Sequence, residues 1–152
     1  MKKILTIAVA FVLVLSLGAC KKKGFENVDS ISYGTSFGMC AGYCHNELSI
    51  SGNKTTMTRQ QNGNPTATKK CNSSVSESEV NEIKKLLNTN AVYKLPKVIG
   101  CPDCADGGAE WVKIKSNGKE YEIAFEYGHA PEALKVAVDK LKAISETFKD
   151  CK

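Results

Sequence analysis

The chain has 152 residues, a formal net charge of +5 and seven cysteines. Its positive surplus is small and scattered, which argues against a nucleic-acid partner. The length is enough for one domain with a modest core. Seven cysteines are many for a chain of this size, so cysteine chemistry is expected to shape the fold.

The first twenty residues have the three parts of a signal peptide. Met1-Lys2-Lys3 is basic, residues 4–17 carry no charge, and Gly18-Ala19 places small side chains just before Cys20. The uncharged stretch is too short for a helix that crosses a bilayer, which needs roughly 20 apolar residues. The pattern therefore predicts an export signal rather than a membrane span.

Leu17-Gly18-Ala19-Cys20 resembles the lipobox of bacterial lipoproteins. The resemblance implies that residues 1–19 are a cleaved lipoprotein signal peptide and that Cys20 becomes an acylated (palmitate-bearing) first residue. Residues 20–27 would then form the lipid anchor and tether, with the membrane as a partner through Cys20. The acidic run that directs some lipoproteins to the cell surface is missing. We therefore expect a cell-envelope protein on the outer membrane, facing the periplasm.

The remaining six cysteines are an even number, and thiols exported beyond the inner membrane tend to oxidise. We expect three disulfides, although six cysteines allow 15 pairings that sequence alone does not separate. The interpretation we favour joins neighbours in sequence, Cys40 with Cys44 and Cys101 with Cys104, and pairs Cys71 with Cys151. The last bond would tie the segment before the first helix to the end of the chain.

Alternating apolar residues predict a first group of three strands. Residues 28–33 form one, residues 47–51 a second, and residues 54–59 return after the two-residue turn Gly52-Asn53. Residues 60–70 are polar and contain Asn-Gly-Asn-Pro, which predicts a mobile loop.

The best local signal marks the start of the first helix. Ser76 and Glu79 have the spacing of a capping box, and Val75 with Val80 matches a hydrophobic staple. The helix is expected to end at residues 88–90, and residues 91–100 are predicted to be irregular around Pro96.

The second half of the chain predicts a hairpin and a helix. Asn117-Gly118 is a type I′ turn signal between strands 109–115 and 120–127, and Pro131 suits the first position of a helix. The order β-β-β-α-β-β-α predicts a single disulfide-braced α+β domain over residues 28–152. We expect an antiparallel sheet of about five strands with two helices packed on one face. Trp111, Tyr121 and Phe125 are predicted to lie in the core.

Residues 28–144 resemble a bacterial family of envelope-associated domains of unknown function. The matching segments are Gly38-Met39-Cys40-Ala41-Gly42-Tyr43-Cys44, Asp106 before the hairpin, and Tyr127-Gly128-His129-Ala130-Pro131-Glu132. The resemblance implies a small α+β domain and supplies no activity. The chain departs from the family pattern by its four other cysteines and by the lack of a proline after Cys44.

Two cysteine motifs raise alternative functions. Cys101-Pro102-Asp103-Cys104 has the spacing of a thiol-disulfide redox motif, but such sites place the attacking cysteine at a helix N-terminus, and here a strand follows. Cys40, Cys44, His45, Cys101 and Cys104 together would suit zinc or copper. Disulfide formation competes directly with the metal site, because a metal needs thiolate ligands.

No residue pattern predicts an enzyme. Asp103, Asp106 and Glu110 match no calcium-loop spacing and are interpreted as a solvated acidic turn. No Ser or Cys nucleophile has a recognisable partner motif, and no cofactor or resident metal is expected. The sequence predicts a non-enzymatic binding or structural module with an unidentified protein or small-molecule partner. Metal-binding or thiol-disulfide redox function is the alternative.

Overall fold

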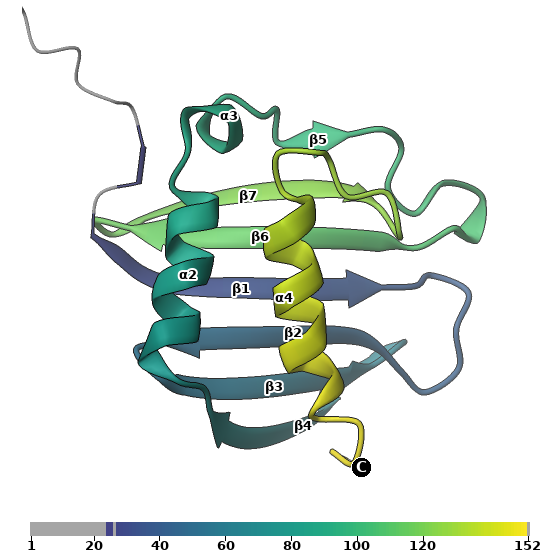
Figure 1. Cartoon of the computed structure of the whole chain (residues 1–152). Helices are drawn as coiled ribbons and strands as arrows, with labels where there is room; N and C mark the ends of the chain where they lie inside the picture. Colours follow the sequence, from purple (N-terminus) through teal and green to yellow (C-terminus); the bar gives the residue numbers. More distant parts are fainter. Residues whose placement is uncertain (1–23, 26, 152) are drawn as a thin grey trace, which may run out of the picture.

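The computed structural model describes residues 24–25 and 27–151. The signal peptide at residues 1–19, Cys20 and most of the tether lie outside these residues. The described residues form one sheet with helices on one face, so the expected α+β class is confirmed (Figure 1). No helix in this part of the chain combines the length and apolar character needed to span a membrane.

The sheet has seven strands in the order β4-β3-β2-β1-β6-β7-β5. Their bounds are β1 Val28–Ser36, β2 Tyr43–Ser51, β3 Lys54–Gln61, β4 Asn64–Ser74, β5 Val98–Ile99, β6 Ala109–Ser116 and β7 Lys119–Glu126. Every neighbouring pair is antiparallel except β5 with β7, which is parallel. The prediction of five antiparallel strands is therefore wrong in number and in strict orientation.

Sequence missed two strands, β5 and β4, and most of β4 occupies residues predicted as a mobile loop. Asn62-Gly63 turns the chain back, with Gly63 at a φ of +71°, and β4 then pairs with β3. Because β4 is an edge strand with most of its residues exposed, neither face selects apolar side chains. The hydrophobic alternation that reveals a half-buried strand is therefore absent.

Two helices, α2 (Glu77–Leu87) and α4 (Lys135–Glu146), cross the strands on the same face of the sheet, as predicted (Figure 1). The Ser76 hydroxyl accepts a hydrogen bond from the Glu79 amide at 3.2 Å, which confirms the predicted cap. Lys140 of α4 pairs with Glu82 of α2 at 3.0 Å. The last helix begins four residues later than predicted, because residues 131–134 form a separate turn whose Pro131 carbonyl accepts from Leu134.

The region expected to be irregular, residues 91–100, contains two short elements. The helix α3 (Asn90–Tyr93) is capped by Thr89, whose hydroxyl accepts from the Val92 amide at 3.2 Å. The two-residue strand β5 follows. Both are too short for periodicity to show in sequence. The three-residue turn η1 (Cys104–Asp106) precedes β6.

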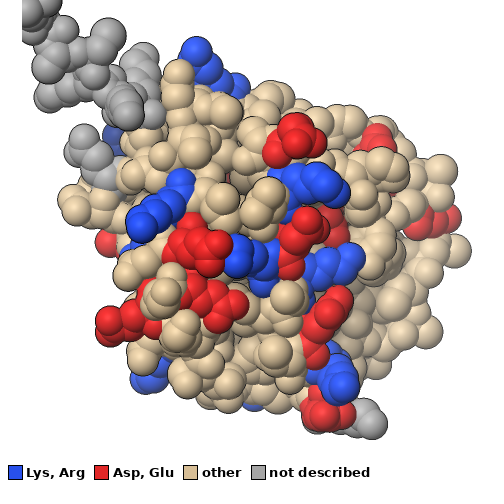
Figure 2. Space-filling model, in the orientation of Figure 1, with Lys and Arg blue, Asp and Glu red and all other residues tan. Residues whose placement is uncertain are grey.

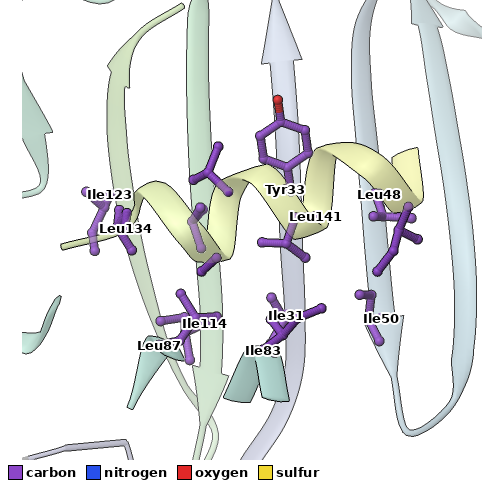
Figure 3. Close-up of a cluster of buried hydrophobic side chains, with 14 of the residues drawn as sticks. Ile31, Tyr33, Leu48, Ile50, Ile83, Leu87, Ile114, Ile123, Leu134 and Leu141 are labelled. Carbon is purple, nitrogen blue, oxygen red and sulfur yellow. The ribbon is translucent and has the colours of Figure 1, made fainter. Parts of the chain in front are cut away.

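The core lies between the sheet and the two long helices. Figure 3 shows side chains of the central strands meeting Ile83 and Leu87 of α2, Leu134 just before α4, and Leu141 of α4. Two cross-strand rows supply the sheet's part of this core: Tyr121, Ile114, Ile31, Ile50 and Thr55 in one, and Ile123, Val112, Tyr33, Leu48 and Met57 in the other. Burial of these side chains is the main force that holds the helices to the sheet.

Candidate functional site

Two short disulfide loops lie at the same end of the sheet. Cys40, between β1 and β2, is joined to Cys44 at the start of β2, and Cys101 is joined to Cys104 between β5 and β6. Figure 1 shows both loops at the end where β1 finishes, away from the beginning of the described chain. We call this the loop end: residues 37–44 and 101–108 with the Asn62-Gly63 turn and Tyr127.

Side-chain contacts hold the loop end together. The Gly38 amide donates to Asp103 Oδ1 at 3.3 Å, and Asn62 Nδ2 donates to the Gly38 carbonyl at 2.6 Å. The rings of Phe37 and Tyr127 meet edge to face, with centroids 4.8 Å apart. Segments distant in sequence therefore form one connected surface.

The third disulfide joins Cys71 of β4 to Cys151 just after α4, across 80 residues. It attaches the exposed edge strand to the end of the last helix. Pairing of the six cysteines as disulfides, which the export hypothesis requires, is thus present in the structure.

The structure does not gather the residues of the alternative metal site. Cys40, Cys44, Cys101 and Cys104 lie in two separate disulfides, and His45 stacks on Trp111 with ring centroids 4.9 Å apart. Within residues 24–25 and 27–151, no group of three or more His, Cys, Asp or Glu side chains is arranged to hold a metal ion.

A polar row crosses the helix-covered face of the sheet next to the loop end. The strand register aligns five polar residues, one from each of five strands, Glu110, Thr35, Asn46, Arg59 and Lys69, and the row ends at the apolar Phe125 of β7. The neighbouring row toward the core is apolar apart from the Tyr33 hydroxyl. Helix α4 covers the core row, and the polar row lies beyond it toward the loop end.

A cavity of about 370 Å³ opens between the polar row and α4. The strands contribute Tyr33, Thr35, Tyr43, Asn46, Met57, Arg59 and, just after β7, Tyr127, while Lys142, Ser145, Glu146 and Lys149 come from α4 and the turn after it. We call it the polar cavity. Its volume is within the usual range of small-molecule sites.

Three cations and one carboxylate line the polar cavity. Arg59 donates from Nη2 to the Phe148 carbonyl at 3.0 Å, and its buried Nε has no hydrogen-bond partner among the described residues. The Lys142 ammonium lies 5.6 Å from the centre of the Tyr127 ring. At the rim, the Lys69 ammonium lies 4.9 Å from the centre of the Tyr43 ring. These cation–π contacts hold the two lysines beside the opening.

Beside the cavity, Tyr33 and Glu110 form a buried polar pair. The Tyr33 hydroxyl donates to Glu110 Oε1 at 2.9 Å, and Glu110 is only 2% exposed. Burial, reinforced by the charge of Glu110, raises the pKa of Tyr33 well above its ordinary value, so the phenol keeps its proton. The interpretation of Glu110 as part of a solvated acidic turn is wrong, because its position in β6 directs it to the helix-covered face.

Trp111 lies on the opposite, helix-free face of the sheet and not in the core predicted for it. Its indole covers Gly34, where any Cβ would overlap the ring, and its Nε1 donates to Glu47 at 3.1 Å. Glu47 also pairs with Lys113 at 3.1 Å. Trp111 is still only 6% exposed, because a glycine beneath the ring lets it lie flat on the sheet.

A second cavity, of about 510 Å³, lies at the other end of the molecule, where the described chain begins. Its aromatic lining includes Phe25, Tyr93 and Tyr121; the rings of Phe25 and Tyr121 meet edge to face at 4.9 Å. The Phe25 amide donates to Asn88 Oδ1 at 2.7 Å, which fixes the chain there at the end of α2.

Sequence reasoning missed the residues of the polar cavity. Arg59, Lys142 and Lys149 show no distinctive pattern in the sequence, and helical spacing does not relate the two lysines because Lys149 lies after the end of α4. The remaining contacts depend on the register of β1, β2 and β3, which no local pattern reveals. No family model matches the chain, and a search of curated proteins also finds no match.

Proposed function

We propose that this chain is a lipid-anchored cell-envelope protein, tethered to a bacterial membrane through Cys20, whose folded part is a non-enzymatic binding module. The polar cavity beside the loop end is its binding site. We favour anchoring in the outer membrane, with the folded domain facing the periplasm.

The observation that carries this proposal is the separation between the two ends of the sheet. The described chain starts at Gly24, close to the beginning of β1, and the loop end follows the last residue of β1. A strand of nine residues advances about 26 Å from its first residue to its last. A lipid on Cys20, only a few residues before Phe25, would therefore hold one end near the bilayer and leave the polar cavity toward solvent.

The disulfides support an extracytoplasmic location. Three cysteine pairs close in this domain, and cytosolic proteins rarely keep such bonds. The charge pattern supports a partner other than nucleic acid, because Figure 2 shows acidic and basic side chains interspersed on the helix-covered face. The loop end in the same view is mostly uncharged.

Replacing the lipidated residue tests the anchoring. In Cys20→Ser we expect a full-length precursor that keeps residues 1–19 and carries no acyl mass, because the thiol that accepts the lipid is missing. Intact-mass analysis and detergent-phase partitioning measure this. The control Ser16→Ala, a change in the same apolar run, should be processed and partition like the unchanged protein. A Cys20→Ser product with the mature mass in the detergent phase would refute the proposal.

A further inference from the structure

We propose that the polar cavity is an oxyanion site that binds the carboxylate or phosphate group of a small molecule. This inference rests on the proposed function, since it names the ligand class of the binding module. It depends on three observations: the surplus of cations, the cross-strand pairing of two of them, and the unused donors of Arg59, which lines a small open cavity.

The cations around the cavity outnumber the carboxylates that line it. Arg59, Lys142 and Lys149 line it with one carboxylate, Glu146, and Lys69 adds a fourth cation at the rim. Among the described residues, the ion pairs within 4.0 Å involve Lys113 and Lys140 only. An anion entering the cavity would therefore meet cations that have no competing carboxylate in contact.

Two of these cations are placed against each other. Arg59 of β3 is the direct cross-strand partner of Lys69 of β4, and like charges in that position destabilise a sheet. An oxyanion bound between them would relieve the repulsion.

Arg59 also has donors to spare. A guanidinium has five N–H groups in a rigid fork that matches carboxylate and phosphate oxygens. In the structure the guanidinium makes one hydrogen bond among the described residues, from Nη2 to the Phe148 carbonyl, and it lines the cavity. Thr35, Asn46 and Ser145 line the same cavity and add neutral donors.

A titration followed by NMR of the full-length, detergent-solubilised protein tests the assignment. The probes are inorganic phosphate, glucuronate and, as a neutral control, glucose, all at constant ionic strength. We expect phosphate or glucuronate to shift the amide signals of Asn46, Arg59 and Glu146 in a saturable way. Glucose should leave these signals in place.

Matched variants separate a site from general charge attraction. Lys142→Gln/Lys149→Gln removes two exposed or half-exposed lysines and should weaken the binding of the anion about tenfold. Lys135→Gln changes an exposed lysine of the same helix away from the cavity and should have no effect. Arg59→Lys keeps the charge but loses the fork, so it should also weaken binding while the spectrum stays that of a folded protein.

Three results would overturn the inference: no saturable shift with either anion, equal weakening by Lys135→Gln, or equal shifts with glucose. If glucose shifts the same amide signals, the assignment of the cavity as an oxyanion site is wrong, while the proposed function as a binding module stands. If the amide signals of the cavity residues respond to none of the three probes, the proposed binding function of the cavity is also wrong.

Discussion

Tyr33 marks the place where the apolar core ends and the polar cavity begins. Its ring packs among the aliphatic residues, while Figure 3 shows its hydroxyl directed away from them along β1. There it donates to the buried Glu110 carboxylate. Because a buried carboxylate without a donor is costly, this single hydroxyl makes it possible for β6 to carry Glu110 on its inner face.

We expect Tyr33→Phe to lower the free energy of unfolding by about 1–3 kcal/mol, because Glu110 would lose a hydrogen-bond donor while it stays buried. Urea unfolding followed by the fluorescence of Trp111, the only tryptophan, measures this. Tyr93→Phe, at a tyrosine 40% exposed, is the control and should change stability little. Equal effects of the two substitutions would show that the buried hydrogen bond is unimportant.

Single residues were predicted well where the chemistry is local. The Ser76 cap and the Asn117-Gly118 turn depend on neighbours within four residues, and the structure contains both. Trp111 and Glu110 were predicted wrongly because each depends on a cross-strand partner. Trp111 lies opposite Gly34, and Glu110 binds Tyr33. Both partners are far away in sequence, so no local pattern indicates these contacts.

At the scale of elements, the exposed edge strand β4 shows why the strand count was underestimated. Its side chains are mostly in water, so it lacks an apolar face, and its pairing with β3 and the Cys71 disulfide hold it in place. The core strands and both long helices were predictable because burial selects apolar side chains at every second or every third to fourth position.

We expect Cys71→Ala/Cys151→Ala to lower the free energy of unfolding by about 4–5 kcal/mol. The bond closes a loop of 80 residues, and in the chain-entropy model a long loop restricts the unfolded chain most. Guanidinium unfolding followed by Trp111 fluorescence measures the loss. Cys40→Ala/Cys44→Ala, whose residues are four apart, should cost about 2 kcal/mol in the same model. A larger loss from the short loop would contradict this explanation.

At the scale of the whole molecule, the two ends of the sheet have different characters. An aromatic cavity lies where the described chain begins, and a polar cavity with more cations than carboxylates lies beside the disulfide loops. Sequence alone supports the anchor and the cysteine framework. The polar cavity could not be predicted from sequence, because it forms only when β1, β2 and β3 pair in this register and α4 packs on them.

We propose that this protein is exported, anchored at Cys20 and closed by three disulfides. Intact-mass analysis of the protein extracted from membranes, before and after reduction, tests it most directly. We expect a chain that starts at Cys20, carries added acyl mass, and gains six hydrogens when its three disulfides are reduced. A chain that retains residues 1–19 and has all seven thiols free would contradict it.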